Sequence, residues 1–358
     1  MYIAIMAGGS GTRFWPASRE SLPKQFLNIT GARPLIMETF YRVAPLTGEE
    51  NIFLVINRAH ESLVKDLFAH HRVSILSEPL GRNTAPCIGL AALHVQRRAG
   101  NAVMAAVPAD HFIYDDEAFR QALRAAAELV AEGGIATLGI TPTRPETGYG
   151  YLLKGPELTR VLSHPVHRLE QFVEKPDLDT ARQYVLSKKY LWNSGIFVFT
   201  TGTILEEIGK YLPRLHAALQ RLDRSLDEGC YDDVLAEVYP TVEAISIDYG
   251  VMEKTRAPVY VLPVHFGWND VGSWQAVYEL RATDHDPLGN LVQGNGLLVD
   301  VHHSLIYSRT NRLIAVLGLE NVMIIDTDDV LLVGDLRRSQ EVRRFPEQLK
   351  NQGREAFC

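Results

Sequence analysis

Short apolar runs alternate with helix-patterned stretches through the first half of the chain. The runs are rich in β-branched residues, and such alternation is typical of βαβ units and of an α/β fold with a mixed, mostly parallel sheet. One helix stands out at 116–132. Asp115 and Asp116 offer N-caps, and Gly133-Gly134 ends its apolar stripe. The predicted strands cover residues 2–6, 52–56, 73–76, 102–107 and 135–140.

The pattern changes after about Gly148. Strands there carry polar and aromatic residues, and helices predicted at 178–188 and 204–222 interrupt them. This arrangement is typical of an insertion that builds one wall of a pocket. The strands are expected at 149–153, 168–173 and 196–199.

A second module follows the predicted helix at 274–282. Turn residues at 284–289 mark a boundary, after which apolar runs recur every 8 to 12 residues or so, as in small all-β modules. We therefore expect two domains, 1–282 and 283–358. The short strands of the second are expected at 297–301, 314–317, 322–325 and 330–333.

Composition narrows the class of protein. A length of 358 residues suggests two domains at roughly 150 residues each, and 46% hydrophobic with 22% charged residues is ordinary for a folded protein. The net charge of −7 and the lack of a long basic run argue against a nucleic-acid polymer as partner, but leave small phosphorylated ligands open. We interpret one group of arginines near the C-terminus as solvated surface: Arg337, Arg338, Arg343 and Arg344.

The cysteines and the apolar stretches indicate the cellular compartment. The three cysteines form no CxxC pair, which argues against a disulfide framework and a structural zinc site. No apolar stretch reaches the roughly 18 residues of a membrane span, and the first residues lack the basic region of a signal peptide. We expect a cytoplasmic protein with no membrane partner.

A glycine-rich segment ends the first strand, with the sequence Gly8-Gly9-Ser10-Gly11-Thr12-Arg13. Its spacing fits neither GxGxxG nor GxxxxGK[ST], so it is neither a dinucleotide fingerprint nor a Walker loop. Glycines at the carboxyl end of an α/β strand let backbone N–H groups close around phosphate oxygens, although such a segment can also be a simple turn. Arg13 and Lys24 add two cations for a polyphosphate.

The segment Glu78-Pro79-Leu80-Gly81-Arg82-Asn83-Thr84 precedes a helical pattern. Asn83 or Thr84 can cap that helix, and this explains much of the segment without a ligand. Capping leaves Glu78 and Arg82 unexplained. Together with the amides at the helix start, these side chains could read the edge of a nucleotide base.

Two carboxylates are candidates for metal binding. Asp110 follows a predicted strand at its carboxyl end, where α/β folds place ligands. Asp270 lies in a loop between two tryptophans. Hard oxygen ligands suit Mg²⁺, which takes one or two carboxylates and completes its shell with phosphate oxygens and water. The alternatives are a turn role for Asp110 and capping by Asp270 of the helix that begins near Ser273.

Polar residues in the inserted strands suit a sugar phosphate. Glycines inside strand patterns mark either close approach to a ligand or a β-bulge. Glutamate and asparagine suit sugar hydroxyls, and lysine suits a phosphate. The candidates are Tyr149, Gly150, Glu174, Lys175 and Asn193.

Taken together in this order, the motifs resemble those of the bacterial mannose-1-phosphate guanylyltransferases, within the sugar nucleotidyltransferase family. The resemblance implies a Rossmann-like nucleotidyltransferase domain, a C-terminal left-handed β-helix and a homodimer. It also implies the conversion of GTP and mannose 1-phosphate to GDP-mannose and pyrophosphate. Many relatives carry a further isomerase domain, and we expect no isomerase activity here. The motifs are Gly8–Pro16, Pro23–Leu27, Glu78–Pro86, Pro108–His111, Val173–Pro176, Trp192–Gly195 and Trp268–Trp274.

The resemblance also implies residue roles. The loop Gly8–Arg13 holds the triphosphate, Lys24 assists at the α-phosphorus, and Asp110 with Asp270 holds Mg²⁺. The residues expected on the guanine side are Glu78, Arg82, Asn83 and Thr84; those expected on the sugar side are Tyr149, Gly150, Glu174, Lys175, Asn193 and Asp270.

Chemistry supports direct transfer. The sugar phosphate is already ionised at neutral pH, so no general base is needed, and no nucleophile with a partnered histidine is evident. Two alternatives stay open: the same fold acting on another sugar 1-phosphate or nucleotide, and a non-catalytic nucleotide-sugar sensor.

Overall fold

The computed structural model describes residues 1–9 and 12–358, which divide into two compact units. The sheet unit comprises Met1–Gly8, Thr39–Ala109 and Ile113–Trp268. The β-helix unit comprises Gly9–Glu38, Asp110–Phe112 and Asn269–Cys358. The chain therefore passes between the units several times. Of the predicted phosphate loop, Ser10 and Gly11 lie outside the described residues.

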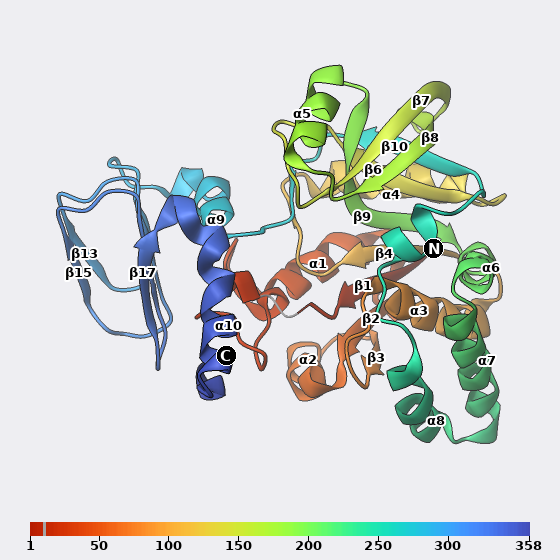
Figure 1. Cartoon of the computed structure of the whole chain (residues 1–358). Helices are drawn as coiled ribbons and strands as arrows, with labels where there is room; N and C mark the ends of the chain where they lie inside the picture. The colour runs from red at the N-terminus through yellow and green to blue at the C-terminus, as the bar shows by residue number, and fades with distance from the viewer. Residues whose placement is uncertain (10–11) are drawn as a thin grey trace. The chain divides into compact units, whose positions relative to one another are not determined.

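A nine-stranded mixed sheet forms the centre of the sheet unit, in the order β3-β2-β1-β4-β9-β6-β10-β8-β7 (Figure 1). Strands β3, β2, β1 and β4 run parallel, as do β6 and β10, whereas β9 is antiparallel to both of its neighbours β4 and β6. The mixed sheet that the sequence predicts is confirmed. Its strands are β1 (Tyr2–Ala7), β2 (Ile52–Asn57), β3 (Ser74–Glu78), β4 (Val103–Pro108), β6 (Ile135–Ile140), β7 (Gly150–Val161), β8 (His164–Glu174), β9 (Tyr190–Thr200) and β10 (Val259–Val264).

Helices of the sheet unit begin at the residues that their capping chemistry favours. Helix α4 (Asp116–Leu129) starts after Asp115, whose side chain accepts a hydrogen bond from the Ala118 N–H at 2.9 Å. Helix α3 (Thr84–Ala99) packs against α6 and α7 (Figure 1). The remaining helices are α1 (Leu35–Thr47), which spans both units, α2 (Glu61–Leu67), α5 (Leu178–Ser187), α6 (Thr201–Tyr211), α7 (Pro213–Glu228) and α8 (Tyr231–Val238).

One helix prediction is wrong. The single helix predicted at 204–222 is two helices, α6 and α7, because Pro213 occupies the first turn of α7. Proline has no backbone N–H and its ring clashes with the preceding turn, so a helix ends before it and a new one begins on it.

The β-helix unit stacks short parallel strands. Strands β12, β14 and β16 pair in parallel, as do β13 and β15, and β17 closes the first set as an antiparallel partner of β16. Register stacks Leu291, Leu305 and Met323, all buried. The β-helix-like module that the sequence predicts is confirmed, but β12 and β14 were not predicted. The strands are β12 (Leu291–Gln293), β13 (Gly296–Val299), β14 (Leu305–Ser308), β15 (Ile314–Leu317), β16 (Val322–Asp326) and β17 (Leu331–Asp335).

A second apolar cluster of the β-helix unit packs on its helices. Helix α9 (Trp274–Leu280) brings the fully buried Trp274 against Phe14 and Tyr307, with ring centroids 5.1 and 5.0 Å away. The two-residue strands β5 (Phe112–Ile113) and β11 (Trp268–Asn269) lie where the chain passes between units.

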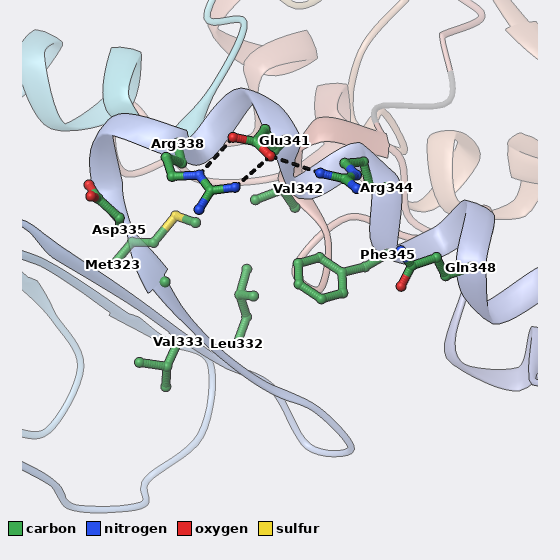
Figure 2. A pocket seen from close by; sticks show the side chains of 11 residues that line it. Met323, Leu332, Val333, Asp335, Arg338, Glu341, Val342, Arg344, Phe345 and Gln348 are labelled. Carbon is green, nitrogen blue, oxygen red and sulfur yellow. Dashed lines mark hydrogen bonds and ion pairs between the residues drawn. The ribbon is translucent and has the colours of Figure 1, made fainter.

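The C-terminal arginines lie on the surface, as predicted. The 3₁₀ segment Leu336–Arg343 and helix α10 (Arg344–Asn351) follow β17. Glu341 pairs with Arg338 and Arg344, and these three side chains line a pocket of about 240 Å³ with Phe345 and residues of β16 and β17 (Figure 2). None of the predicted site residues lines this pocket.

Within the part of the chain that the structure describes, no helix is both long and apolar enough to cross a membrane.

Candidate active site

Lys24 is the centre of a charged cluster in the β-helix unit. It lies in a short 3₁₀ turn and is buried, although lysine is rarely buried without a partner. Its Nζ donates hydrogen bonds to Asp110 Oδ2 at 2.7 Å and to the Asp270 carbonyl at 2.6 Å. Three residues that are far apart in the sequence and predicted to act together therefore meet at one ammonium group.

Asp110 is held in its ionised form. The surrounding protein on its own raises the pKa of this carboxyl, but the charges of Lys24 and His111 and the Lys24 hydrogen bond outweigh that effect, so the pKa is lowered. The side chain is 36% exposed, which leaves part of the carboxylate accessible to a ligand. Asp110 lies in a turn directly after β4, so the position predicted for it at a strand's carboxyl end is confirmed.

Arg13 lies beside Asp270. Its Nη1 donates to the Gly272 carbonyl at 3.4 Å, and a Cβ added at Gly272 would lie 3.2 Å from that Nη1 and 3.1 Å from Asp270 Oδ2. Gly272 thus leaves room for both charged groups. The alternative in which Asp270 caps helix α9 is wrong, because Ser273 caps it by accepting from the Ala276 N–H at 3.3 Å.

These residues fit a divalent cation that is shared with phosphate groups. Asp110 and Asp270 offer hard oxygens in one unit, and Lys24 contacts both residues. No group of three or more His, Cys, Asp or Glu able to hold a metal occurs among residues 1–9 and 12–358. Two carboxylates completed by phosphate oxygens and water are the ligand set that Mg²⁺ adopts in nucleotide enzymes.

The described part of the glycine loop is open. Gly8, Gly9 and Thr12 are exposed, and a Cβ added at Gly9 would meet nothing within 4 Å. The buried Gln25 donates from Nε2 to the Gly9 carbonyl at 3.1 Å, which fixes that peptide. Ser10 and Gly11 were predicted as phosphate ligands and lie outside the described residues.

Glu78 is buried in the sheet unit at the end of β3. Its Oε1 accepts a hydrogen bond from the Tyr239 hydroxyl. Burial raises the pKa of Glu78 to about 7, although the Tyr239 hydrogen bond works in the opposite direction. A Cβ at Gly8 would lie 3.4 Å from Glu78 Oε2, so the start of the glycine loop and this carboxyl are neighbours.

The start of helix α3 holds the other residues predicted on the guanine side. Asn83 caps the helix with its side chain, in a left-handed conformation (φ 69°). The Thr84 hydroxyl accepts from the Ile247 N–H at 2.8 Å, and Arg82 donates from Nη2 to the Pro240 carbonyl. The capping that the sequence suggests is confirmed, and both other side chains have protein partners.

Three residues predicted on the sugar side meet at the start of β7. Gly150 pairs with Glu174 across the β7–β8 ladder, and a Cβ at Gly150 would lie only 2.5 Å from Glu174 Oε2 and 3.2 Å from the Asn193 Cβ. The glycine therefore permits a close approach of these two side chains to the β7 backbone. Glu174 is 8% exposed, and its Oε2 is buried without a hydrogen-bond partner among the described residues. A buried carboxylate oxygen in this state calls for a hydrogen-bond donor.

Lys175 and Tyr149 complete this group. Lys175 Nζ donates to Glu174 Oε1 at 2.6 Å, and its backbone N–H donates to the Tyr149 carbonyl. Partial burial lowers the pKa of Lys175, but the Glu174 hydrogen bond and charge outweigh it, so the pKa is raised. The Tyr149 ring packs edge-on against Trp192 and Trp268. Lys175 is thus a half-exposed cation with its charge retained at neutral pH.

Asp248 is a residue that the sequence analysis missed. Asn193 Nδ2 donates to Asp248 Oδ1 at 2.8 Å, and burial together with the Glu174 charge raises the pKa of Asp248 to about 6. Asp248 belongs to no recognised motif and lies 55 positions from Asn193, so only the fold shows the contact. No pattern in the sequence could have found it.

A nine-stranded mixed sheet with a glycine loop after β1, together with a paired lysine and two carboxylates, indicates a nucleotidyltransferase. The family model described as nucleotidyl transferase matches residues 3–286, and that of the MannoseP isomerase/GMP-like β-helix domain matches residues 294–349. The chain belongs to the nucleotidyl transferase family, and it is an enzyme of the nucleotidyltransferase class. The resemblance noted from the sequence is confirmed.

Relatives place the chain among the bacterial mannose-1-phosphate guanylyltransferases. The chain is 41% identical over 354 residues to the xanthan biosynthesis protein XanB of Xanthomonas campestris pv. campestris, covering 98% of this chain and 73% of that protein. It is 38% identical over 357 residues to a mannose-1-phosphate guanylyltransferase of Klebsiella pneumoniae, covering 99% and 74%. The crystal structure described as a mannose-1-phosphate geranyltransferase from Thermus thermophilus superimposes with a TM-score of 0.86 at 37% identity, covering 98% of this chain and 99% of that one.

Proposed function

We propose that this enzyme transfers the guanylyl group of GTP to α-D-mannose 1-phosphate, giving GDP-mannose and pyrophosphate. The observation that carries the proposal is the Lys24 ammonium, buried and bonded to both Asp110 and Asp270. The relatives named as mannose-1-phosphate guanylyltransferases support the choice of base and sugar.

The reaction needs charge neutralisation rather than a base. A phosphate oxygen of mannose 1-phosphate attacks the α-phosphorus of GTP, the bond from that phosphorus to the β-bridging oxygen breaks, and pyrophosphate leaves in line with the attack. Both reactants are anions, so fixed positive charges lower the barrier most where negative charge builds up. Arg13 and Lys24 provide such charges next to Asp270.

Asp110 and Asp270 are the residues we assign to Mg²⁺. The lowered pKa of Asp110 keeps its carboxylate ionised at neutral pH, as a metal ligand must be. When bound, Mg²⁺ neutralises phosphate charge and polarises the α-phosphate. Lys24 holds the two aspartates in place by its hydrogen bonds.

Residues of the sheet unit are assigned to the two substrates. Glu174 Oε2 accepts a hydrogen bond from a mannose hydroxyl, Asn193 contacts the same sugar, and Lys175 contacts its phosphate. The unpartnered, buried state of Glu174 Oε2 supports this assignment. On the guanine side we assign Glu78, Arg82, Asn83 and Thr84, which gather at the end of β3 and the start of α3.

We further propose a cytoplasmic homodimer with the domain boundary at 282/283. All three cysteines are free, which supports a reducing compartment. Exposed apolar side chains on β13 and β15 support a partner surface on the β-helix unit: Leu297, Val299 and Leu317.

The experiment that tests the function is pyrophosphate release by the purified protein with Mg²⁺. GTP, ATP, UTP and dTTP are each combined with mannose 1-phosphate and with glucose 1-phosphate. We expect the pair of GTP and mannose 1-phosphate to dominate. Equal rates with another sugar or base would contradict the substrate assignment, and GTP binding without turnover would contradict catalysis.

A further inference from the structure

The segment 245–253 carries none of the residues assigned so far, yet it contacts both groups of assigned residues in the sheet unit. At its start, the Ile245 carbonyl accepts from the Ala85 N–H at 3.1 Å, and the Ile247 N–H donates to the Thr84 hydroxyl at 2.8 Å. These bonds attach the segment to the first turn of α3, on the guanine side.

Asp248 then fixes the amide of Asn193. The Asn193 Oδ1 accepts from the Gly195 N–H at 3.1 Å, so the oxygen of the amide faces that donor. The Nδ2 consequently faces Asp248, to which it donates at 2.8 Å. Because the acceptor is a carboxylate, this hydrogen bond is charge-assisted and stronger than one between two neutral groups. The orientation of the Asn193 amide is therefore determined by hydrogen bonds of both its oxygen and its nitrogen.

Two further contacts reach the sugar-phosphate side. The Lys175 Nζ lies 6.0 Å from the centre of the Tyr249 ring, within the range of a cation–π contact. At the end of the segment, Glu253 Oε1 accepts from the Glu174 N–H at 3.1 Å. One segment thus contacts Asn193, Lys175 and Glu174, each through a different side chain of its own.

The backbone of the segment explains how it does so. Asp248–Met252 is a π-helical turn, a form that is rare in proteins and is often found at functional sites. Ile247, Val251 and Met252 are buried in the main apolar core, which anchors the turn. With these residues anchored, Asp248, Tyr249 and Glu253 are free to contact the assigned residues.

We propose that the segment 245–253 is the positioning element of the sugar-phosphate site and that Asp248 and Glu253 are its positioning residues. The proposal rests on the proposed function. Asp248 orients the Asn193 amide and Glu253 holds the backbone of Glu174. Neither residue takes part in the chemistry; each acts through a residue that contacts the sugar.

Substitutions at Asp248 test the hydrogen bond. Asp248→Leu has a similar volume and no acceptor, whereas Asp248→Asn keeps an acceptor oxygen for the Asn193 Nδ2. We expect Asp248→Leu to raise the KM for mannose 1-phosphate about tenfold or more, the effect of losing one charge-assisted hydrogen bond. The KM for GTP and the kcat should change less than about threefold. Asp248→Asn should restore the KM to within about threefold of wild type.

Glu253 gives a second test that does not put folding at risk, because its side chain is exposed. Glu253→Ala removes the acceptor of the Glu174 N–H, and Glu253→Gln keeps one. We expect Glu253→Ala to raise the KM for mannose 1-phosphate about threefold to tenfold, with Glu253→Gln close to wild type. Glu237→Ala is the control, since Glu237 is an exposed, hydrogen-bonded glutamate of the same unit that contacts Arg221 instead.

The outcomes separate the two proposals. An active wild type whose KM for mannose 1-phosphate is unmoved by Asp248→Leu and by Glu253→Ala would overturn the positioning role and leave the proposed function standing. Equal increases in the KM for both substrates would indicate a merely structural role and would also overturn the positioning role. A wild type inactive with GTP and mannose 1-phosphate would overturn the proposed function itself. If Asp248→Leu does not fold, the comparison of Glu253→Ala with Glu253→Gln decides whether the segment has the positioning role.

Discussion

Lys24 is the residue on which the proposed chemistry depends most. Lys24→Met keeps the length of the side chain and removes its charge, and so leaves Asp110 without its cationic partner. Removing one preorganised group that stabilises transition-state charge costs about 10²–10³ in kcat. We expect kcat to fall by at least about 10² at saturating substrates, measured by pyrophosphate release. Lys65→Met is the control, since Lys65 is an exposed lysine that pairs with Glu61 on its own helix.

A substitution at Gly150 tests whether Glu174 belongs to the sugar site. Gly150→Ala places a methyl group 2.5 Å from Glu174 Oε2, a distance that real Cβ atoms do not tolerate, so Glu174 must move. We expect the KM for mannose 1-phosphate to rise about tenfold, the cost of about one hydrogen bond to a charged group. In Gly31→Ala the new methyl lies at an ordinary 3.6 Å from its nearest neighbour, and this control should behave as wild type. An unchanged KM in Gly150→Ala would remove Glu174 from the sugar site.

Glu78 makes the stability of the protein depend on pH. Its pKa is raised by burial to about 7 in the folded chain, against 4.5 for a free glutamate carboxyl. The folded chain therefore keeps a proton that the unfolded chain loses between pH 4.5 and 7, so the free energy of unfolding falls as the pH rises through this window. The size of the effect is roughly 3 kcal/mol.

Glu78→Gln removes this titration. We expect the difference in unfolding free energy between the variant and wild type to grow in favour of the variant from pH 4.5 to 7 and to level off above it. Urea unfolding across this pH range measures it. A difference that does not change with pH would show that the folded and unfolded states hold the Glu78 proton equally.

Elements that carry strong local signals were predictable from the sequence. Helix α4 begins after its capping Asp115, as the sequence predicts, and β6 was predicted with its observed bounds, Ile135–Ile140. Strand β15 was also predicted with its observed bounds, Ile314–Leu317, whereas β12 and β14, which pair with each other in parallel, were missed. Pro213 lies in the interior of the helix predicted at 204–222, and proline there indicates a helix boundary.

Some residues of the candidate site could also be predicted from the sequence, and others could not. Lys24, Asp110 and Glu174 could be selected from the sequence because each lies in a short contiguous motif, and Asp110 also follows a strand at its carboxyl end, where α/β folds place ligands. Asp248 and Tyr239 could not, since their contacts with Asn193 and Glu78 join segments far apart in the chain. Long-range hydrogen bonds of this kind follow from the fold and have no local pattern.

Packing between helices gives a prediction at the element scale. Gly89 on α3 faces α7, and a Cβ there would lie 2.8 Å from Leu219 Cδ1. Alanine favours a helix by about 1 kcal/mol over glycine, but overpacking a core costs about 1–3 kcal/mol. We expect Gly89→Ala to lower the free energy of unfolding by about 1 kcal/mol, measured by urea unfolding. A more stable variant would show that α3 and α7 have room to move apart.

At the scale of the whole molecule, the two units carry different parts of the proposed work. Arg13, Lys24, Asp110 and Asp270 belong to the β-helix unit, and the guanine-side and sugar-side groups belong to the sheet unit. The β-helix unit therefore contributes the phosphate and metal residues as well as its stacked strands. Segments 9–38 and 110–112 enter that unit from the first part of the chain.

The proposed homodimer also belongs to this scale. Val299 on β13 pairs in register with Leu317 on β15, and the two side chains are 49% and 71% exposed. Neighbouring exposed apolar side chains on short strands are typical of a partner surface. We expect wild type to sediment as a dimer and Leu317→Arg as a monomer with unchanged folding. A dimer that survives the substitution would remove the β13–β15 face from the interface.

The configuration at phosphorus tests the central claim, direct guanylyl transfer to mannose 1-phosphate, most directly. The enzyme is given mannose 1-phosphate and one diastereomer of GTP that carries sulfur on the α-phosphate, and the configuration of the resulting thio-GDP-mannose is determined. A single in-line displacement inverts the phosphorus, so we predict inversion. Retention would mean two displacements through a covalent enzyme intermediate, and no thio-GDP-mannose despite turnover of another pair would contradict the substrates themselves.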